Sequence, residues 1–199
     1  LSHGSVSYLK SLAVWPALAQ DAAPIKDIHI SDRGYYGKAR INAQQHQVSA
    51  LGYVVEMSLL GKALLNKAAQ YDNIHWFCPD EIVNINWQSE QVDMSLSSGQ
   101  QLTARLVLAC DGAQSKCRQF ANITSSSKSY QQSALIVNVS MSQSHRNVAY
   151  ERFTESGSIA MLPLNDGSSD SRKCSVVWTV TPERAQQLLS LSENEFAQA

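Results

Sequence analysis

Residues 106–118 combine side chains that could bind a nucleotide cofactor. An apolar run ends at Asp111 and Gly112, and Ser115 and Arg118 follow. In an open α/β sheet, ligands bind beyond the carboxyl ends of the strands. Asp111 could accept hydrogen bonds from ribose hydroxyls there, and Gly112 would let a phosphate or a ring approach the backbone. Arg118 could place a charge near phosphate or anchor the loop to Asp111. An ordinary Asp-Gly turn followed by a capped helix is the alternative interpretation.

The sequence contains none of the common catalytic or phosphate-binding motifs. A P-loop and the GxGxxG, HExxH, GxSxG and EF-hand patterns are all missing. The histidines are scattered, and we expect His29 and His75 to lie in strands as solvent-facing or hydrogen-bonded residues. The cysteines form no CxxC pair and favour reduced thiols over a metal site; they are Cys78, Cys110, Cys117 and Cys174.

Composition describes an ordinary globular chain. It has 199 residues, of which 44% are hydrophobic and 17% charged, with a formal net charge of −1. Such a chain can bury a core and is not disordered. The near-zero charge gives no support for a nucleic-acid binder with a broad basic face. No apolar stretch is long enough for a membrane-spanning helix, and no signal peptide is present. The opening Leu-Ser-His suggests a piece of a longer protein.

The elements around the Asp-Gly segment follow from hydrophobic periodicity. In the first part of the chain, helices are predicted at 5–18, with Ser5 as N-cap and a bend at Pro16, and at about 55–70. A hairpin is predicted from strands at 25–32 and 39–42, and a short strand at 73–78.

The clearest strand signal lies between residues 81 and 109. Alternating strands are predicted at 82–87 and 92–96, and a third at 102–108. Its continuous apolar run, 106–110, is typical of a strand covered on both faces in a parallel sheet. A short helix is predicted at 115–120, followed by a Ser-rich domain crossing near 125–129.

The last third of the chain reads as mostly strand. Four strands are predicted, at 134–140, 148–153, 158–163 and 174–180. A helix at 182–191 follows, with Thr181 as N-cap, and a further helix begins at Ser192.

The segment 109–118, ACDGAQSKCR, resembles the Asp-Gly fingerprint of the group A flavoprotein monooxygenases, which have the para-hydroxybenzoate hydroxylase fold. Further segments narrow the resemblance to the FAD-dependent hydroxylases of ubiquinone biosynthesis. They are SDRG at 31–34, LGYVVE at 51–56, YERFTESG at 150–157, IAMLPL at 159–164 and SVVWT at 175–179. The resemblance covers essentially the whole chain, in order and without large gaps.

The resemblance implies an enzyme that uses FAD, NAD(P)H and O2 to hydroxylate a polyprenylated phenol. The cofactor carries the hard chemistry, so no catalytic side chain and no metal are expected. A cytoplasmic location is expected, with peripheral contact at the inner membrane through the substrate. Other proteins of ubiquinone biosynthesis are candidate partners, and nucleic acid is not.

The resemblance also implies site residues. The implied cofactor contacts are Asp111, Gly112, Arg118, Val54, Val55 and Val83. Val54 and Val55 fall where the family's chain passes the flavin, and Val83 near the adenine; a plain strand core position explains Val83 equally well. The candidate lining of the substrate pocket is Tyr150, Phe153, Met161 and Trp178. A core role is the alternative for these four, because alternate strand residues face inward in any case.

Two of the family's flavin-binding segments fall outside the sequence. The GxGxxG of its first βαβ unit would precede residue 1, and a later Gly-Asp segment would follow residue 199. We therefore expect an α+β fragment of the fold that binds FAD weakly or not at all and is inactive alone. A partial FAD-binding domain is expected from 1–23 and 51–126. A partial substrate-binding domain with an antiparallel sheet is expected from 24–50 and 127–199.

Two other functions remain open. One is a sibling hydroxylase that acts on another ring position of the same pathway. The other is a non-catalytic interaction module that keeps the fold for assembly with pathway proteins. The gene sequence that flanks residues 1 and 199 would separate the enzyme from the module, because only the enzyme needs intact GxGxxG and Gly-Asp segments.

Overall fold

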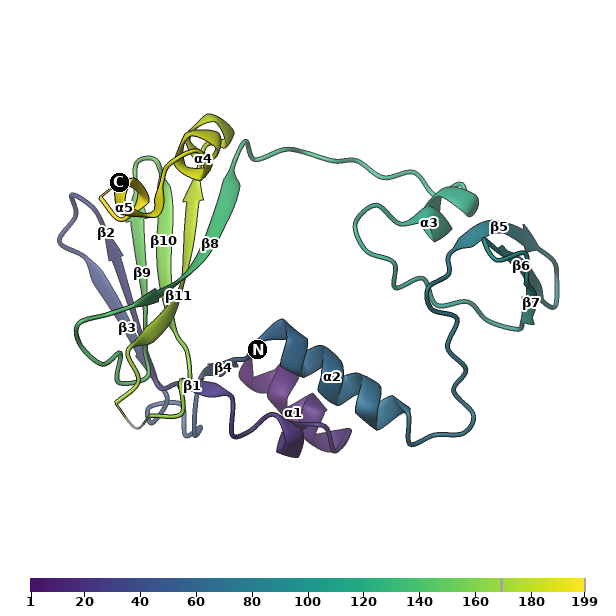
Figure 1. The fold of residues 1–199 in the computed structure, drawn as a ribbon, viewed down its shortest axis with the longest axis horizontal. Helices are drawn as coiled ribbons and strands as arrows, with labels where there is room; N and C mark the ends of the chain where they lie inside the picture. Colours follow the sequence, from purple (N-terminus) through teal and green to yellow (C-terminus); the bar gives the residue numbers. More distant parts are fainter. Residues whose placement is uncertain (169, 199) are drawn as a thin grey trace. The chain divides into compact units, whose positions relative to one another are not determined.

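The computed structural model describes residues 1–168 and 170–198, which form two compact units (Figure 1). The first, here called the sheet unit, comprises Leu1–Tyr71 and Ser129–Ala199. The second, the Asp-Gly unit, is Asp72–Lys128. The sequence-based assignment to an FAD-binding and a substrate-binding part divides the chain differently. Residues 1–23 and 51–71, assigned there with the Asp-Gly segment, pack in the sheet unit.

A six-stranded sheet dominates the sheet unit, in the order β3-β2-β9-β10-β11-β8. Every neighbouring pair is antiparallel except β2 and β9, which run parallel. The sheet confirms the predicted hairpin and the four predicted C-terminal strands. Its strands are β2 (Asp27–Asp32), β3 (Lys38–Asn42), β8 (Ser133–Ser140), β9 (Val148–Thr154), β10 (Gly157–Pro163) and β11 (Lys173–Val180).

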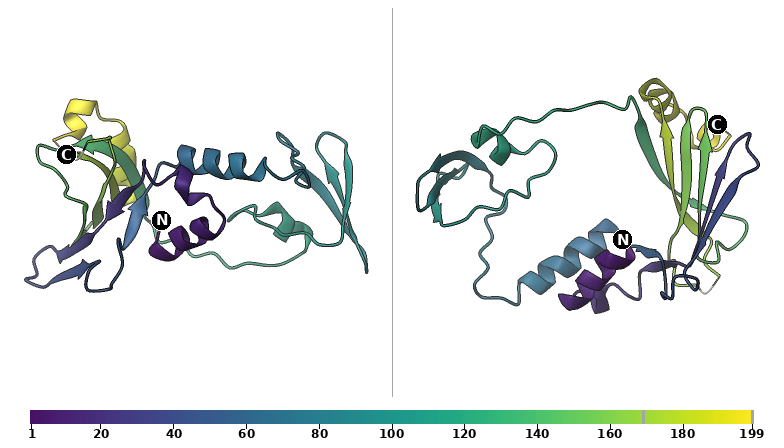
Figure 2. Two further views of the ribbon diagram at one scale, coloured as in Figure 1. Left: turned by 90° about the horizontal axis from the view of Figure 1, so that it is seen from below. Right: turned by 180° about the vertical axis from the view of Figure 1, so that it is seen from behind.

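Two helices follow β11 and pack on one face of this sheet (Figures 1 and 2). The helix α4 (Pro182–Leu189) begins after Thr181, whose side chain accepts the amide hydrogen of Arg184. This confirms the predicted N-cap. Leu188 of α4 is 1% exposed and packs with Val180 of β11. The short α5 (Glu193–Phe196) places the Phe196 ring edge-on to Trp178.

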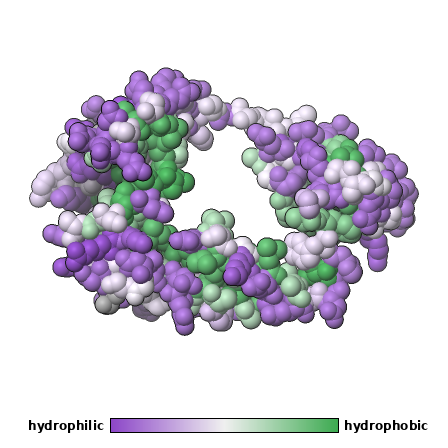
Figure 3. All heavy atoms as spheres, viewed as in Figure 1, coloured by the Kyte–Doolittle hydropathy of each residue, from purple (hydrophilic) through white to green (hydrophobic). Residues whose placement is uncertain are grey.

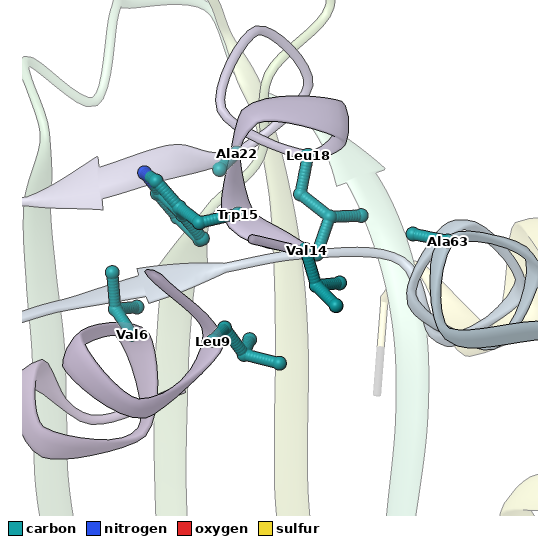
Figure 4. Packing of buried hydrophobic residues seen from close by; sticks show 7 residues of the cluster. All are labelled: Val6, Leu9, Val14, Trp15, Leu18, Ala22 and Ala63. Atoms are coloured by element: carbon teal, nitrogen blue, oxygen red, sulfur yellow. The ribbon is translucent and has the colours of Figure 1, made fainter. Parts of the chain in front are cut away.

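The N-terminal layer consists of α1 (His3–Ser11), the 3-10 turn η1 (Trp15–Ala17), β1 (Ala23–Ile25), β4 (Gly52–Val54) and α2 (Met57–Ala68). The single helix predicted at 5–18 is wrong. Ser2 rather than Ser5 caps α1, and Ala13 takes a left-handed φ of 53° that ends the helix before Pro16. The chain can therefore fold back and bury Trp15 and Leu18 against α1 and α2 (Figure 4).

The Asp-Gly unit is a three-stranded antiparallel sheet with one short helix. Its elements are β5 (Ile82–Trp87), β6 (Val92–Leu96), β7 (Gln101–Ala104) and α3 (Lys116–Phe120). The predicted helix at 115–120 and both alternating strands are confirmed. A core of Ile85, Val92, Met94 and Cys117 lies between the sheet and α3.

One predicted strand of the Asp-Gly unit, at 73–78, is wrong, and another, at 102–108, is confirmed only as far as Ala104. Residues 73–78 are irregular, and so is the apolar run 106–110, in which Leu106 and Leu108 are 71% and 76% exposed. The third strand stops at Ala104 because its partner β6 begins at Val92, the residue that pairs with Ala104. A strand needs a neighbour for its backbone hydrogen bonds. The described residues of this unit supply none beyond that point.

Among the described residues, no helix is long and apolar enough to cross a membrane.

The N-terminal core supplies the first testable prediction. Leu18 is 1% exposed within the cluster of α1, η1 and α2. Leu18→Ala should therefore lower the free energy of unfolding by about 3 kcal/mol, because it leaves a cavity. Urea unfolding followed by circular dichroism measures the loss. Leu12→Ala is the matched control, because Leu12 is 40% exposed. Equal losses in the two variants would contradict this packing.

Candidate functional site

Asp111 is the centre of a hydrogen-bond hub that folds the Asp-Gly turn. Its Oδ1 accepts the Ser115 hydroxyl at 2.6 Å, and its Oδ2 accepts the Cys117 amide at 3.0 Å. Ser115, which is buried, in turn accepts the amide of Arg118 at 2.9 Å and so caps α3. The turn and the helix are therefore one rigid piece, with the carboxylate at its start.

Gly112 and Arg118 complete the turn. Gly112 has a φ of +82°, which favours glycine, and a Cβ placed there would meet no atom within 4 Å. Its backbone is thus open to an approaching group. The Arg118 guanidinium donates to the Ala113 carbonyl at 2.9 Å. It therefore anchors the loop through the backbone, and not through Asp111 as one sequence interpretation held.

The hydrogen bonds to Asp111 determine the protonation states of the side chains in the turn. The Ser115 hydroxyl, followed by the Cys117 amide, lowers the pKa of the Asp111 carboxyl to about 2. Burial, followed by the nearby Asp111 charge, raises the pKa of the Cys117 thiol. At neutral pH the turn thus presents one carboxylate beside a neutral thiol and a guanidinium.

A cavity of about 400 Å³ adjoins this turn within the Asp-Gly unit. Its lining includes Gly112, Ser115 and Arg118 from the turn, Trp87 from β5, and Val107. The Trp87 indole donates to the Phe120 carbonyl at 3.3 Å, which ties α3 to β5. The cavity is therefore walled by polar groups of the turn and by apolar side chains, a composition typical of cofactor sites.

Val83 lies in the same unit, at an irregular point of β5. The register with β6 passes from the Ile82–Leu96 pair directly to the Asn84–Ser95 pair. Val83 is thus the extra residue of a β-bulge, which leaves it outside the ladder. Its side chain is 46% exposed. This exposure does not fit the core interpretation.

Val54 and Val55 lie in the sheet unit and point to different environments. Val55 packs against the buried N-terminal cluster. Val54 instead lines a cavity of about 340 Å³ together with Glu56, Leu164 and Asn165. The structure therefore separates the six predicted cofactor residues. Asp111, Gly112 and Arg118 lie in the Asp-Gly turn, Val83 lies at the β5 bulge, Val54 lines the second cavity, and Val55 packs on the N-terminal core.

A buried network holds the wall of the second cavity. The Leu164 carbonyl accepts the Ser171 hydroxyl at 2.8 Å and bonds to Nε2 of His145 at 3.1 Å. Nδ1 of His145 accepts the Asn147 amide at 3.0 Å, so Nε2 carries the proton. His145 and Ser171 are only 6% and 5% exposed. The side chain of Asn165 donates to the Gln20 carbonyl at 2.6 Å and fastens the same wall to the N-terminal layer.

The four predicted substrate residues do not share one face of the sheet. Cross-strand partners lie on the same face, and successive residues alternate. Trp178 pairs with Ile159 and Tyr150 with Met161, which places all of them on the face that α4 covers. Phe153 is three residues from Tyr150 and lies on the opposite face. There it lines a cavity of about 480 Å³ with Ser158 and Thr179.

Sequence reasoning missed His145, Ser171 and the Leu164–Asn165 wall. A lone histidine carries no spacing signal, and the Leu164 carbonyl to which it bonds is 19 residues away. His29 lies in β2, edge-on to the Tyr150 ring at 5.3 Å, whereas His75 lies in the irregular stretch and not in a strand. Among the described residues, no group of three or more His, Cys, Asp or Glu is placed to hold a metal.

The hub predicts an unusual titration. The Asp111 carboxyl should titrate at about pH 2 by carbon NMR, and Ser115→Ala should raise its pKa because the strongest donor is lost. A depressed pKa stabilises the fold above the unfolded-state value, and this contribution disappears as pH falls towards 2. Asp80 is the control. Its pKa is also about 2, but Ser97 and Ser98 hold it, so Ser115→Ala should not move it. An Asp111 midpoint near 4 in the unaltered chain would contradict the hub.

The buried network predicts a selective loss of stability. His145→Phe leaves the Asn147 amide without a partner and the Leu164 carbonyl with only the Ser171 hydroxyl, so the free energy of unfolding should fall by about 1–3 kcal/mol. Denaturant unfolding measures the change. The exposed His46 provides the control, since His46→Phe should change the stability little. An unchanged free energy of unfolding in His145→Phe would show that the network does not stabilise the Leu164–Asn165 segment.

The chain is similar to known flavoproteins over its whole length. The FAD binding domain family matches residues 1–199. The ubiquinone hydroxylase UbiL of Rhodospirillum rubrum is 31% identical over 191 residues, which cover 94% of this chain and 42% of that protein. The 3-demethoxyubiquinol 3-hydroxylase of Escherichia coli is 28% identical over 195 residues, which cover 96% of this chain and 48% of that protein. The chain thus spans less than half the length of these relatives.

A solved structure confirms the fold class. PqsL of Pseudomonas aeruginosa, in complex with 2-aminobenzoylacetate, matches with a TM-score of 0.79 at 15% identity, over 100% of this chain and 54% of that chain. PqsL is described as a probable FAD-dependent monooxygenase. The fold is therefore the predicted α+β, para-hydroxybenzoate hydroxylase-like one. Because the family match extends over every residue, the chain belongs to the FAD binding domain family.

Proposed function

We propose that the protein containing this chain is an FAD- and NAD(P)H-dependent monooxygenase that hydroxylates the ring of a polyprenylated phenol in ubiquinone biosynthesis. The observation that carries the proposal is the Asp-Gly turn, held rigid with an ionised Asp111, in a chain of the FAD binding domain family. The similarity to a ubiquinone hydroxylase and a demethoxyubiquinol hydroxylase supports the substrate class.

The residues present fit FAD on three counts. Asp111 is held ionised and can accept from hydroxyls with its remaining lone pairs. Gly112 leaves open space where any other residue would place a Cβ. The bulge at Val83 frees a stretch of backbone that could bond to an adenine edge. We assign these three residues and Arg118 to the cofactor, with NAD(P)H approaching the same turn.

FAD, when bound, supplies the redox chemistry that delivers one atom of O2 to an electron-rich ring. The chain's own residues bind, orient and exclude water. The network of His145 and Ser171 keeps the Leu164 wall in place opposite Val54, where we place the flavin ring edge. No side chain of this chain is assigned to proton transfer.

The open face of the six-stranded sheet is where we place the substrate. It is the face away from α4, and the register puts Ile136, Ala160 and Val177 on it together with Phe153. Ile136 is 72% exposed, and hydrophobic residues gather along β8 in Figure 3. Glu151, the partner of Ala160, lies on the same face. The apolar side chains of this face suit a prenyl chain, whose burial is favourable by roughly 25 cal/mol per Å².

The predicted substrate residues differ in how well they suit this placement. Phe153 lies on the open face and keeps its proposed role. Tyr150, Met161 and Trp178 lie on the other face, where Trp178 packs against Phe196, so a core role suits them better. These three residues could contact the substrate only if its pocket lay on the face that α4 covers.

Two related hydroxylases of the same pathway, which act on different ring positions, are both compatible with this chain. The segments that carry the family resemblance are similar to 2-octaprenyl-6-methoxyphenol hydroxylase, whereas the relative in Escherichia coli is named for a different position, as a 3-hydroxylase. Product analysis in cells that lack each hydroxylase separates the two.

A non-catalytic interaction module is the alternative function, and such a protein would purify without flavin. Partner proteins of the pathway and a peripheral place at the inner membrane belong to the same proposal.

The proposal is tested by flavin binding with a matched pair of glycine variants. The full-length gene product should purify yellow with one FAD per chain, and residues 1–199 alone should bind FAD weakly or not at all. Gly112→Ala in the full-length protein should weaken FAD binding about tenfold or more, because the Cβ narrows the approach to the turn. Gly99→Ala should leave FAD binding unchanged.

The control isolates the site from backbone strain. Gly99 has a φ of +88° in a turn of the same unit, so alanine strains both positions alike. Equal effects of the two variants on FAD affinity would contradict the assignment of Gly112. A colourless full-length protein would favour the interaction module instead.

A further inference from the structure

The tip of the β2–β3 hairpin exposes two adjacent aromatic side chains. Tyr35 is 75% exposed and Tyr36 is 99% exposed, at the turn that joins Asp32 to Lys38. The side chain of Tyr36 thus packs against nothing in the described chain. The hairpin lies at the edge of the six-stranded sheet, since β3 is its first strand (Figure 1).

Basic residues flank this tip along the chain, and one acidic residue, Glu155, follows the end of β9 beside it. Arg33, Lys38 and Arg40 flank the tyrosines, and no Asp or Glu occurs from residue 33 to residue 55. The segment therefore has an excess of positive charge in a chain whose net charge is −1. Asp32 is the nearest carboxylate along the chain, at the base of the tip.

The strand register adds a fourth cation to the same surface. Ser31 pairs with Lys38 on one side and with Arg152 of β9 on the other, so both cations share one face of the sheet. The Arg152 guanidinium donates to the Ser31 hydroxyl at 3.4 Å. Asp32 is the next residue along β2 and therefore points to the opposite face.

Protection of the sheet edge explains only part of this arrangement. Lysine and arginine on an edge strand discourage pairing with another chain, which accounts for Lys38 and Arg40. It does not account for two exposed tyrosines at the tip, because aromatic surface favours association instead. Tyrosine next to Lys and Arg is the pattern found where proteins meet the headgroup region of a bilayer.

We propose that this hairpin tip binds the surface of an anionic lipid bilayer. Tyr35 and Tyr36 enter the headgroup layer, and Arg33, Lys38 and Arg40 face the lipid phosphates. The tip is a convex turn, and the cavities described above are lined by other residues, so a flat, extended partner fits it better than a small anion. The near-neutral chain disfavours nucleic acid as that partner. The proposal does not depend on flavin binding.

Vesicle sedimentation of this chain tests the proposal. The probes are vesicles of phosphatidylcholine alone and vesicles that also contain phosphatidylglycerol. The chain should sediment with the anionic vesicles, and added salt should weaken binding because it screens the cations. Tyr35→Ser with Tyr36→Ser should lower the partition coefficient about tenfold, and Lys38→Gln with Arg40→Gln should lower it similarly.

The controls carry the same substitutions at other exposed positions. Tyr8 and Tyr71 are 66% and 50% exposed, and Tyr8→Ser with Tyr71→Ser should leave vesicle binding unchanged. Lys62→Gln with Lys67→Gln on α2 controls for overall charge. The single variant Tyr36→Ser guards against misfolding, because a side chain that is 99% exposed contributes no packing. Absence of vesicle binding by the unaltered chain, equal losses in the control variants, or binding to DNA but not to vesicles would each overturn the proposal.

Discussion

The parallel pairing of β2 with β9 is the constraint on which the sheet unit depends. It brings together residues as far apart in the chain as Ser31 and Arg152, which are 121 positions apart. The chain forms the β2–β3 hairpin and α2, passes through the whole Asp-Gly unit, and only then supplies β9. Without this pairing the hairpin would lose its place in the sheet, because a lone hairpin is marginally stable in water.

The pairing also decides what each face of the sheet can do. Once β9 is fixed beside β2, the register carries through β10 and β11 to β8. One face then receives α4 and Trp178, and the other is left open with Ile136 and Phe153. The Asp-Gly unit folds around different constraints, the Asp111–Ser115 hub and a small core of its own. The two units thus have independent folding requirements.

Much of this could be predicted from local pattern, and two of the failures share one physical cause. The strands of β8 to β11 carried their alternation and turn signals in the sequence, and Thr181 was a recognisable cap. Residues 106–110 had a strand's composition, but composition does not reveal whether a neighbouring strand is there to pair with it. His145 was missed for the same reason, because the Leu164 carbonyl to which it bonds comes from another loop. Tyr150 and Phe153, by contrast, must lie on opposite faces of the sheet, because they are three positions apart in one strand and successive residues alternate.

The proposed function requires that one oxygen atom of O2 enters the aromatic ring of the substrate. Isotope-labelled dioxygen tests it most directly, with the full-length protein, FAD, NADPH and a polyprenylated phenol, followed by mass spectrometry of the product. The account predicts that one labelled oxygen atom enters the ring and that one NADPH is consumed per product molecule. Unlabelled product, or no product from a protein that binds FAD fully, would contradict it.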